Sequence, residues 1–168
     1  MTRSSRIVLF PEPVLRAPCR SVAEFDDELL SLVSRLDHTM RAQRHGIGIA
    51  APQIGVAVRV ALVDVSSRVP GSESLVLVNP EILSKGGVKL SREGCMSLPD
   101  YTADLKRYEW VVVRWQDETG LFHEKKCEGI EAVCVQHEVD HLNGVLFLDR
   151  VSCLKTDMYP RGTKSIKK

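Results

Sequence analysis

The chain has 168 residues, the length of one globular domain, and a net charge of +1 that argues against binding nucleic acid by neutralising phosphates. Its apolar runs are too short for a membrane span or a secretory signal peptide, and its five scattered cysteines form no disulfide pattern. We therefore expect a cytoplasmic protein with no membrane partner and no specific nucleic-acid partner.

The first predicted element is an amphipathic helix over roughly 25–43, because its apolar residues recur at three- and four-residue steps. These residues are Phe25, Leu29, Leu32, Leu36 and Met40. The next segment, Gly46–Pro52, breaks this periodicity and is predicted to be a loop or an irregular extended stretch. We expect strands over 58–65, 75–78 and 110–115, a hairpin partner over 121–127, and a final helix over 130–142. Strands that cluster between two helices, without β–α–β alternation, predict an α+β fold.

The final predicted helix contains the sequence HEVDH, which is typical of a metal site. His137 and His141 are four residues apart, so they lie on one helical face and can bind one metal ion. Glu138 is then placed beside the metal's water, where a carboxylate can act as general base. Two histidines do not complete a catalytic site, which usually has three protein ligands and one open position.

Residue types alone leave the third ligand open among His38, His45, His123, the cysteines and the carboxylates. Cys134 shares the helical face of His137, although a cysteine in that position is more often a small apolar side chain. Cys95 follows a glycine and is flanked by turn-forming residues, which favours a side chain presented from a loop.

The segment Gly46–Gln53 (GIGIAAPQ) formally matches the dinucleotide fingerprint G-x-G-x-x-A. It follows a predicted helix rather than a strand, and its proline precedes a predicted strand, so we do not expect nucleotide binding. Glycines here let the backbone approach a ligand closely, and Gln53 can donate a hydrogen bond to an oxygen.

Together, GIGIAAPQ, EGCMS (Glu93–Ser97) and HEVDH resemble, in order, the three motifs of the peptide deformylase family. Its members remove the formyl group from N-formylmethionyl nascent chains. The resemblance covers the chain from Leu15 to Leu148-Asp149. It implies mixed or antiparallel sheets packed around a central C-terminal helix that carries the HExxH motif. It also implies one catalytic domain over 1–150 and a short basic tail over 151–168.

The resemblance further implies a metal site and a proton-transfer group. Cys95, His137 and His141 would bind one divalent ion per chain, with Fe²⁺ expected as the native ion and Zn²⁺, Ni²⁺ or Co²⁺ as alternatives. Glu138 would take the proton of the attacking water and deliver it to the departing amine.

The same resemblance assigns the groups around the substrate. Gln53 and the backbone N–H of Met96 would stabilise the oxyanion on the formyl carbon, and Gly48 would contribute a backbone contact to the substrate. The apolar pocket for the methionine side chain would consist of Ile47, Ile130, Val133 and Cys134. The last three share a helical face with His137.

Two departures from the family pattern affect the expected partners. Thr102 stands where many bacterial members carry an arginine, so contacts beyond the methionine differ here. The tail is short and interrupted by Pro160 and Gly162, whereas some members end in a long basic helix that docks on the ribosome. We expect a solvated, partly disordered tail, and N-formylmethionyl nascent peptides as the main partner with at most transient ribosome contact. Around the motifs, Glu93 and Arg107 could form a pair behind the site or on the surface.

Two other classes of protein remain as alternatives. A zinc endopeptidase shares the HExxH signature, but a cysteine ligand would be unusual there. A non-catalytic metal-binding module would not need Glu138 or Gln53, and both are intact.

Overall fold

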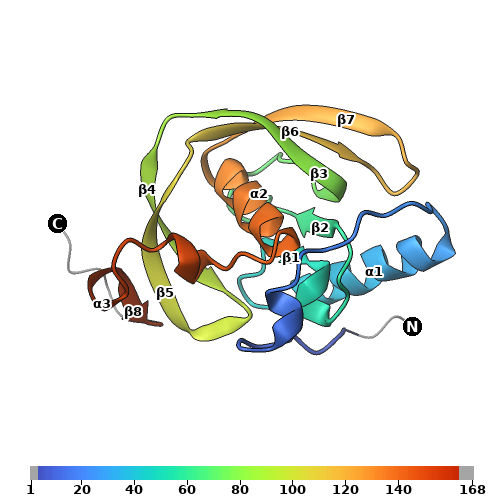
Figure 1. The fold of residues 1–168 in the computed structure, drawn as a ribbon. Coiled ribbons are helices and arrows are strands. Elements are labelled where there is room, and N and C mark those ends of the chain that lie inside the picture. Colours follow the sequence, from blue (N-terminus) through green and yellow to red (C-terminus); the bar gives the residue numbers. More distant parts are fainter. Residues whose placement is uncertain (1–3, 163–168) are drawn as a thin grey trace.

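Two antiparallel sheets surround the helix that carries the HExxH motif in the computed structural model, which describes residues 4–162 (Figure 1). The helices are η1 (Pro13–Leu15), α1 (Asp27–Arg41), η2 (Ala51–Ile54), α2 (Gly129–Leu142), η3 (Phe147–Arg150) and α3 (Leu154–Asp157). The strands are β1 (Gly48–Ala50), β2 (Val60–Val63), β3 (Leu75–Gly86), β4 (Lys89–Cys95), β5 (Leu98–Arg107), β6 (Trp110–Gln116), β7 (Phe122–Glu128) and β8 (Met158–Pro160). One sheet has the order β1-β2-β3-β6-β7 and the other β4-β5-β8. The predicted α+β class is confirmed.

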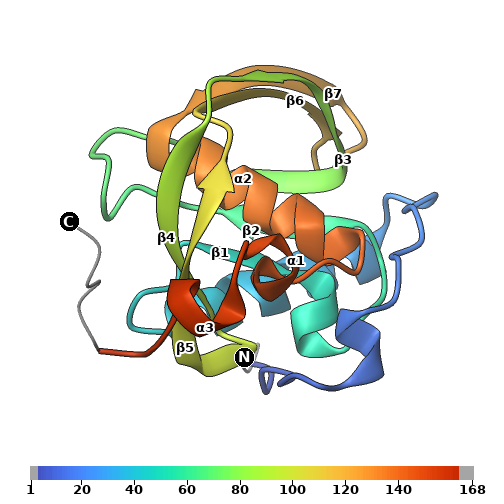
Figure 2. The same ribbon diagram turned by 60° about the vertical axis from the view of Figure 1, so that its left-hand side comes forward.

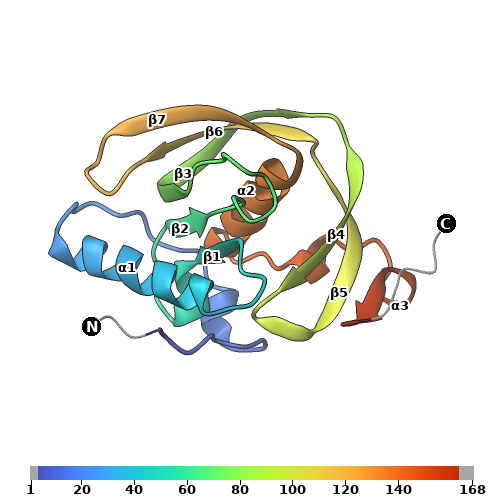
Figure 3. The ribbon, with the colours of Figure 1, turned by 180° about the vertical axis from the view of Figure 1, so that it is seen from behind.

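The two long helices cover opposite faces of the β1–β2 part of the larger sheet (Figure 3). Side chains alternate between the faces of a strand, so Ile49 and Leu62 pack with α1 while Ala50 and Ala61 pack with α2. The predicted helix over 25–43 is confirmed as α1, which begins where the Asp26 carboxylate accepts the N–H groups of the first turn.

Helix α2 lies in the middle of the molecule, between the two sheets (Figure 2). Its apolar residues Ala132, Val135, Val139 and Leu142 are buried in the same cluster as Ala50. Because this helix is buried on several sides, the polar residues of its HExxH motif are enclosed by the protein rather than exposed on its surface.

The segment Gly46–Pro52, predicted as a loop or an irregular extended stretch, is more regular than expected from Gly48 onward, where it forms β1 and the start of η2. A strand of three residues is too short to show an alternating pattern in a sequence, and it exists here because it pairs with β2. Strands β4 and β5 were also missed. The burial of β4 alternates, but its more buried positions include the polar Ser91 and Glu93, so the sequence shows no apolar alternation. In β5 the consecutive residues Pro99, Asp100 and Tyr101 are all exposed, which interrupts the alternation.

The chain beyond residue 150 joins the smaller sheet. Strand β8 pairs with β5, with Tyr159 opposite Thr102, so the expectation of a solvated tail is wrong as far as residue 162. The basic residues Lys164, Lys167 and Lys168 lie outside the described residues. The division of the chain at residue 150 stays a prediction. Within residues 4–162, no helix has both the length and the apolar character to cross a bilayer.

Candidate active site

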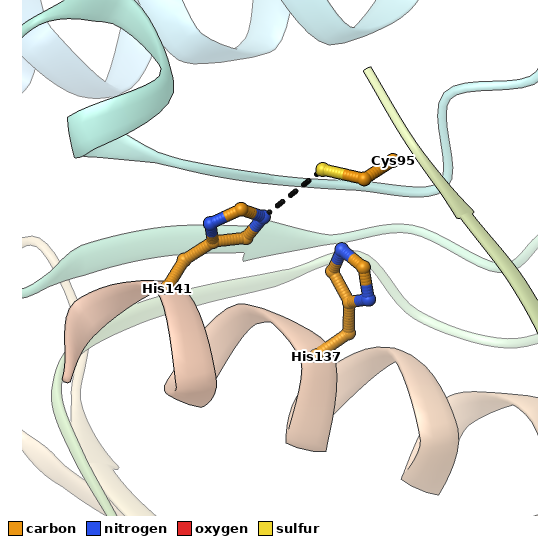
Figure 4. A group of neighbouring side chains, drawn as sticks. All are labelled: Cys95, His137 and His141. Atoms are coloured by element: carbon orange, nitrogen blue, oxygen red, sulfur yellow. Dashed lines mark hydrogen bonds between the residues drawn. The ribbon is translucent and has the colours of Figure 1, made fainter. Parts of the chain in front are cut away.

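The structure brings together the three predicted metal ligands. Figure 4 shows the imidazoles of His137 and His141 projecting from neighbouring turns of α2 toward the Cys95 thiol, which comes from the end of β4. One ligand atom from each of the three residues lies within 4.8 Å of the others, and the Cys95 Sγ is 3.3 Å from the Nε2 of His141. Cys134, the other cysteine considered as a ligand, has its thiol directed at the carbonyl of Ile47.

The chemistry of these donors fits a divalent transition metal. The Nδ1 of His137 lies 2.9 Å from the Oε2 of Glu93, which leaves the Nε2 of that ring available as a ligand. Burial raises the pKa of the Cys95 thiol, but the imidazoles of His141 and His137 outweigh burial and hold that pKa well below its ordinary value. A thiolate with two imidazoles is a donor set suited to Fe²⁺, Co²⁺, Ni²⁺ or Zn²⁺.

A buried ionic network supports His137 from behind. Arg107 donates to both oxygens of Glu93, at 2.7 and 3.0 Å, and to the Oδ2 of Asp140 at 2.6 Å. Although burial opposes ionisation, the hydrogen bonds from His137 and Arg107 lower the pKa of Glu93 to about 2. Glu93 and Arg107 therefore form a buried ion pair, and the alternative of a surface pair is wrong.

Replacement of Arg107 by alanine is expected to destabilise the fold by about 3–5 kcal/mol, because it removes the guanidinium from the buried Glu93 carboxylate, while Asp140 keeps its pair with Arg150. The midpoint and slope of urea unfolding, followed by tryptophan fluorescence, measure this change. Arg114 is a matched control because its pair with Glu124 is exposed, and Arg114→Ala should cost no more than about 1 kcal/mol. Equal losses in the two variants would contradict a structural role for the network.

Glu138 lies next to the ligands in an enclosed position. Its side chain is 3% exposed, and among the described residues its Oε2 has no hydrogen-bond partner. Burial raises its pKa to about 7, a value suited to a group that both accepts and donates a proton near neutrality. A Cβ at Gly48 would lie only 2.4 Å from the Oε1 of Glu138, so the glycine leaves the space that the carboxylate occupies. The sequence pattern alone did not indicate this contact.

Gln53 is held with its NH₂ group toward the ligands. Its Oε1 accepts the backbone N–H of Ala50 at 3.0 Å, so its Nε2 faces the Sγ of Cys95 at 3.4 Å and the Oγ of Ser97 at 3.2 Å. The side chain is 1% exposed. The amide is thus a fixed donor beside the metal ligands, as expected for a group that stabilises a developing negative charge.

The four residues predicted to hold the methionine side chain lie near one another. Ile47 and Ile130 are half-buried and pack against the cluster that contains Cys134, and Val133 is half-buried on α2. Burial raises the pKa of Cys134 well above its ordinary value, so its thiol is neutral and apolar in character.

The fold and the site define a metal-dependent hydrolase with an HExxH helix and a cysteine ligand. Residues 4–157 match the model of the polypeptide deformylase family, and the chain belongs to this family. A peptide deformylase of Acidobacterium capsulatum is 41% identical over 162 residues, covering 96% of this chain and 95% of the relative. The predicted activity, removal of the N-formyl group from nascent peptides, is confirmed by this membership.

Solved structures agree with this assignment. A crystal structure of a peptide deformylase from Legionella pneumophila has a TM-score of 0.85 and 41% identity, covering 90% of this chain and 88% of that one. A class I type b peptide deformylase from Acinetobacter baumannii, with Met-Ala-Ser bound, has a TM-score of 0.84 and 34% identity, covering 90% of this chain and all of that one (100%).

Proposed function

We propose that the chain hydrolyses the formamide of N-formylmethionyl peptides at the cluster of Cys95, His137 and His141. The observation that carries this proposal is the position of Glu138 beside that cluster, buried and with a raised pKa. Water is consumed, the C–N bond of the formamide breaks, and formate and a free N-terminal amine are released. Cys95, His137 and His141 would hold a divalent cation, which would supply Lewis-acid chemistry by lowering the pKa of a water molecule.

The proton transfers are assigned to Glu138. Its carboxylate takes the proton of the attacking water and later gives it to the departing nitrogen, which cannot leave as an anion. The burial of Glu138 raises its pKa to about 7, so the carboxyl can exchange a proton near neutral pH.

Stabilisation of the oxyanion is assigned to two donors. The NH₂ group of Gln53 and the backbone N–H of Met96 would both donate to the formyl oxygen as it gains negative charge. Gly48 would offer its backbone to the peptide substrate, in addition to leaving space for Glu138.

Formate release from formyl-Met-Ala-Ser tests this function. We expect rapid release from this peptide and no cleavage of casein, the outcome that separates a deformylase from a zinc endopeptidase. The Met-Ala-Ser found in the Acinetobacter baumannii structure is the deformylated form of the same peptide. A chain that binds metal but releases no formate would be a non-catalytic module.

The pocket of Ile47, Ile130, Val133 and Cys134 is proposed to bind the methionine side chain. Val133→Trp should raise KM for formyl-Met-Ala-Ser at least tenfold, because a bulky ring fills the space of the substrate's side chain. Steady-state kinetics measure the change. An unchanged KM would mean that this face of α2 belongs to the core.

We propose Fe²⁺ as the native ion. A ferrous site with a thiolate ligand is sensitive to oxygen, through oxidation of the metal or of the sulfur. Activity of anaerobically purified protein should therefore decay in air, be protected by catalase or a reductant, and persist when Ni²⁺ or Co²⁺ replaces iron. An enzyme that is stable in air and fully active with zinc alone would exclude iron and leave the ligand assignment unchanged.

The setting proposed for this reaction is the cytoplasm, where nascent chains emerge. The described C-terminal segment is folded onto β5, which supports at most a transient contact with the ribosome.

A further inference from the structure

The β4–β5 hairpin that carries Cys95 is irregular near its tip. Gly94 pairs with Thr102, but the next residue, Cys95, pairs with Leu98. Residues 99–101 are therefore extra residues on β5 with no opposite residue on β4 in this register. The backbone groups of such a bulge need other hydrogen-bond partners.

Arg161, which follows β8, provides partners for this bulge. Its backbone N–H donates to the carbonyl of Asp100 at 2.8 Å, and its guanidinium Nε donates to the carbonyl of Pro99. Its Nη2 reaches the carbonyl of Cys95 at 3.4 Å. Gly94 leaves room for the guanidinium, since a Cβ there would lie 2.9 Å from the same Nη2.

The contact with Cys95 involves the peptide group whose N–H is proposed to stabilise the oxyanion. The carbonyl of Cys95 and the N–H of Met96 belong to the same peptide, and in a planar trans peptide these two groups point in opposite directions. A cation that holds the carbonyl on the outer side therefore sets the direction of the N–H on the inner side. Donation to a carbonyl also polarises the peptide and makes its N–H a stronger donor.

We propose that Arg161 is a positioning residue, which orients and polarises the Cys95–Met96 peptide so that the Met96 N–H is a fixed donor in the active site. This inference rests on the proposed role of Met96 in stabilising the oxyanion. Arg161 acts through the peptide and does not contact the substrate. The C-terminal segment would thus contribute to the reaction through strand pairing with β5 and through one side chain.

Kinetics of Arg161→Ala and Arg161→Lys provide the first test. Loss of a direct oxyanion donor costs about 10²–10³ in kcat, and Arg161 acts one peptide away, so we expect about a tenfold loss in Arg161→Ala. Arg161→Lys keeps a cationic donor and should lose less. KM and metal content should stay near the wild-type values. Lys155→Ala, which removes another exposed cation of the same segment, is the matched control and should match the wild type.

The second test does not depend on activity. The chain has four methionines, so selective ¹⁵N labelling of methionine in the zinc-loaded protein gives a simple amide spectrum. In Arg161→Ala the Met96 amide should shift, because the hydrogen bond to the preceding carbonyl is lost. Met158 in β8 and Met40 in α1 should stay in place, which shows that strand pairing and the fold persist.

An unchanged Met96 amide, or unchanged kcat in Arg161→Ala, would overturn the positioning role and leave the proposed function intact. A shift of Met158 together with Met96 would also overturn it, because β8 would then have detached as a whole. If the wild-type chain releases no formate from formyl-Met-Ala-Ser, the proposed function fails and this role in it fails as well.

Discussion

Glu138→Ala is expected to retain its bound metal and its fold while losing about 10²–10⁴ in kcat, the usual contribution of general acid–base catalysis. The reason is geometric. Glu138 lies beside the three ligands but is not one of them, and its Oε2 has no partner within the described part of the chain. Its removal takes away the proton acceptor and leaves the donor set untouched. Glu138→Gln keeps the volume of the side chain and should lose as much activity.

Formate release, metal content and the unfolding midpoint should be measured on the same preparations. Glu131→Ala is a suitable control, because Glu131 lies on the same helix and is paired with Lys125 outside the site. We expect this variant to keep its kcat. Wild-type turnover in Glu138→Ala would remove Glu138 from the mechanism, and loss of the metal would show that its effect is on the site as a whole.

Cys95→Ser is expected to lose both its metal and its detectable activity. A serine hydroxyl is a harder donor with a much higher pKa than a thiol, so it does not supply the anionic, soft ligand that this site presents. Metal retained after dialysis against a chelator is the measurement, followed by formate release after re-addition of metal.

Cys134→Ser is the matched control for metal retention. Its thiol is as buried as that of Cys95 but is directed at the carbonyl of Ile47, and its pKa is raised rather than lowered. We expect this variant to keep its metal. Loss of metal in Cys134→Ser together with retention in Cys95→Ser would reverse the assignment of the third ligand.

The parts of the site that could be predicted from the sequence are those set by short-range spacing. Two histidines four residues apart meet on a helix whatever the rest of the fold does, so His137 and His141 were predictable from local geometry. Cys95 was one of several candidates by residue type, and the family resemblance selected it. The helices α1 and α2 were predicted within about two residues at each end because their apolar periodicity is strong.

The parts that could not be predicted depend on contacts between distant segments. Arg107 lies 33 positions from Asp140, and nothing local shows that the two meet in the interior. Arg161 reaches the Cys95 carbonyl from 66 positions away. Strand β4 lacked a usable pattern because the polar Ser91 and Glu93 occupy its more buried positions. In β5 a bulge and a run of exposed residues interrupt the alternation. Strand β1 exists through its pairing with β2 rather than through its own composition.

The burial of the reacting groups limits the time during which a substrate protein can be deformylated. Glu138, Gln53 and Cys95 are nearly inaccessible to solvent, so a formyl group reaches them only at the end of a chain segment that can extend away from its own protein. A protein whose first residues have already docked into its own core cannot present that end. Synthesis adds about 5–20 residues per second and domains fold as they emerge. Deformylation therefore competes kinetically with folding of the substrate's N-terminus. When the enzyme is scarce, proteins whose N-termini fold early should most often keep the formyl group.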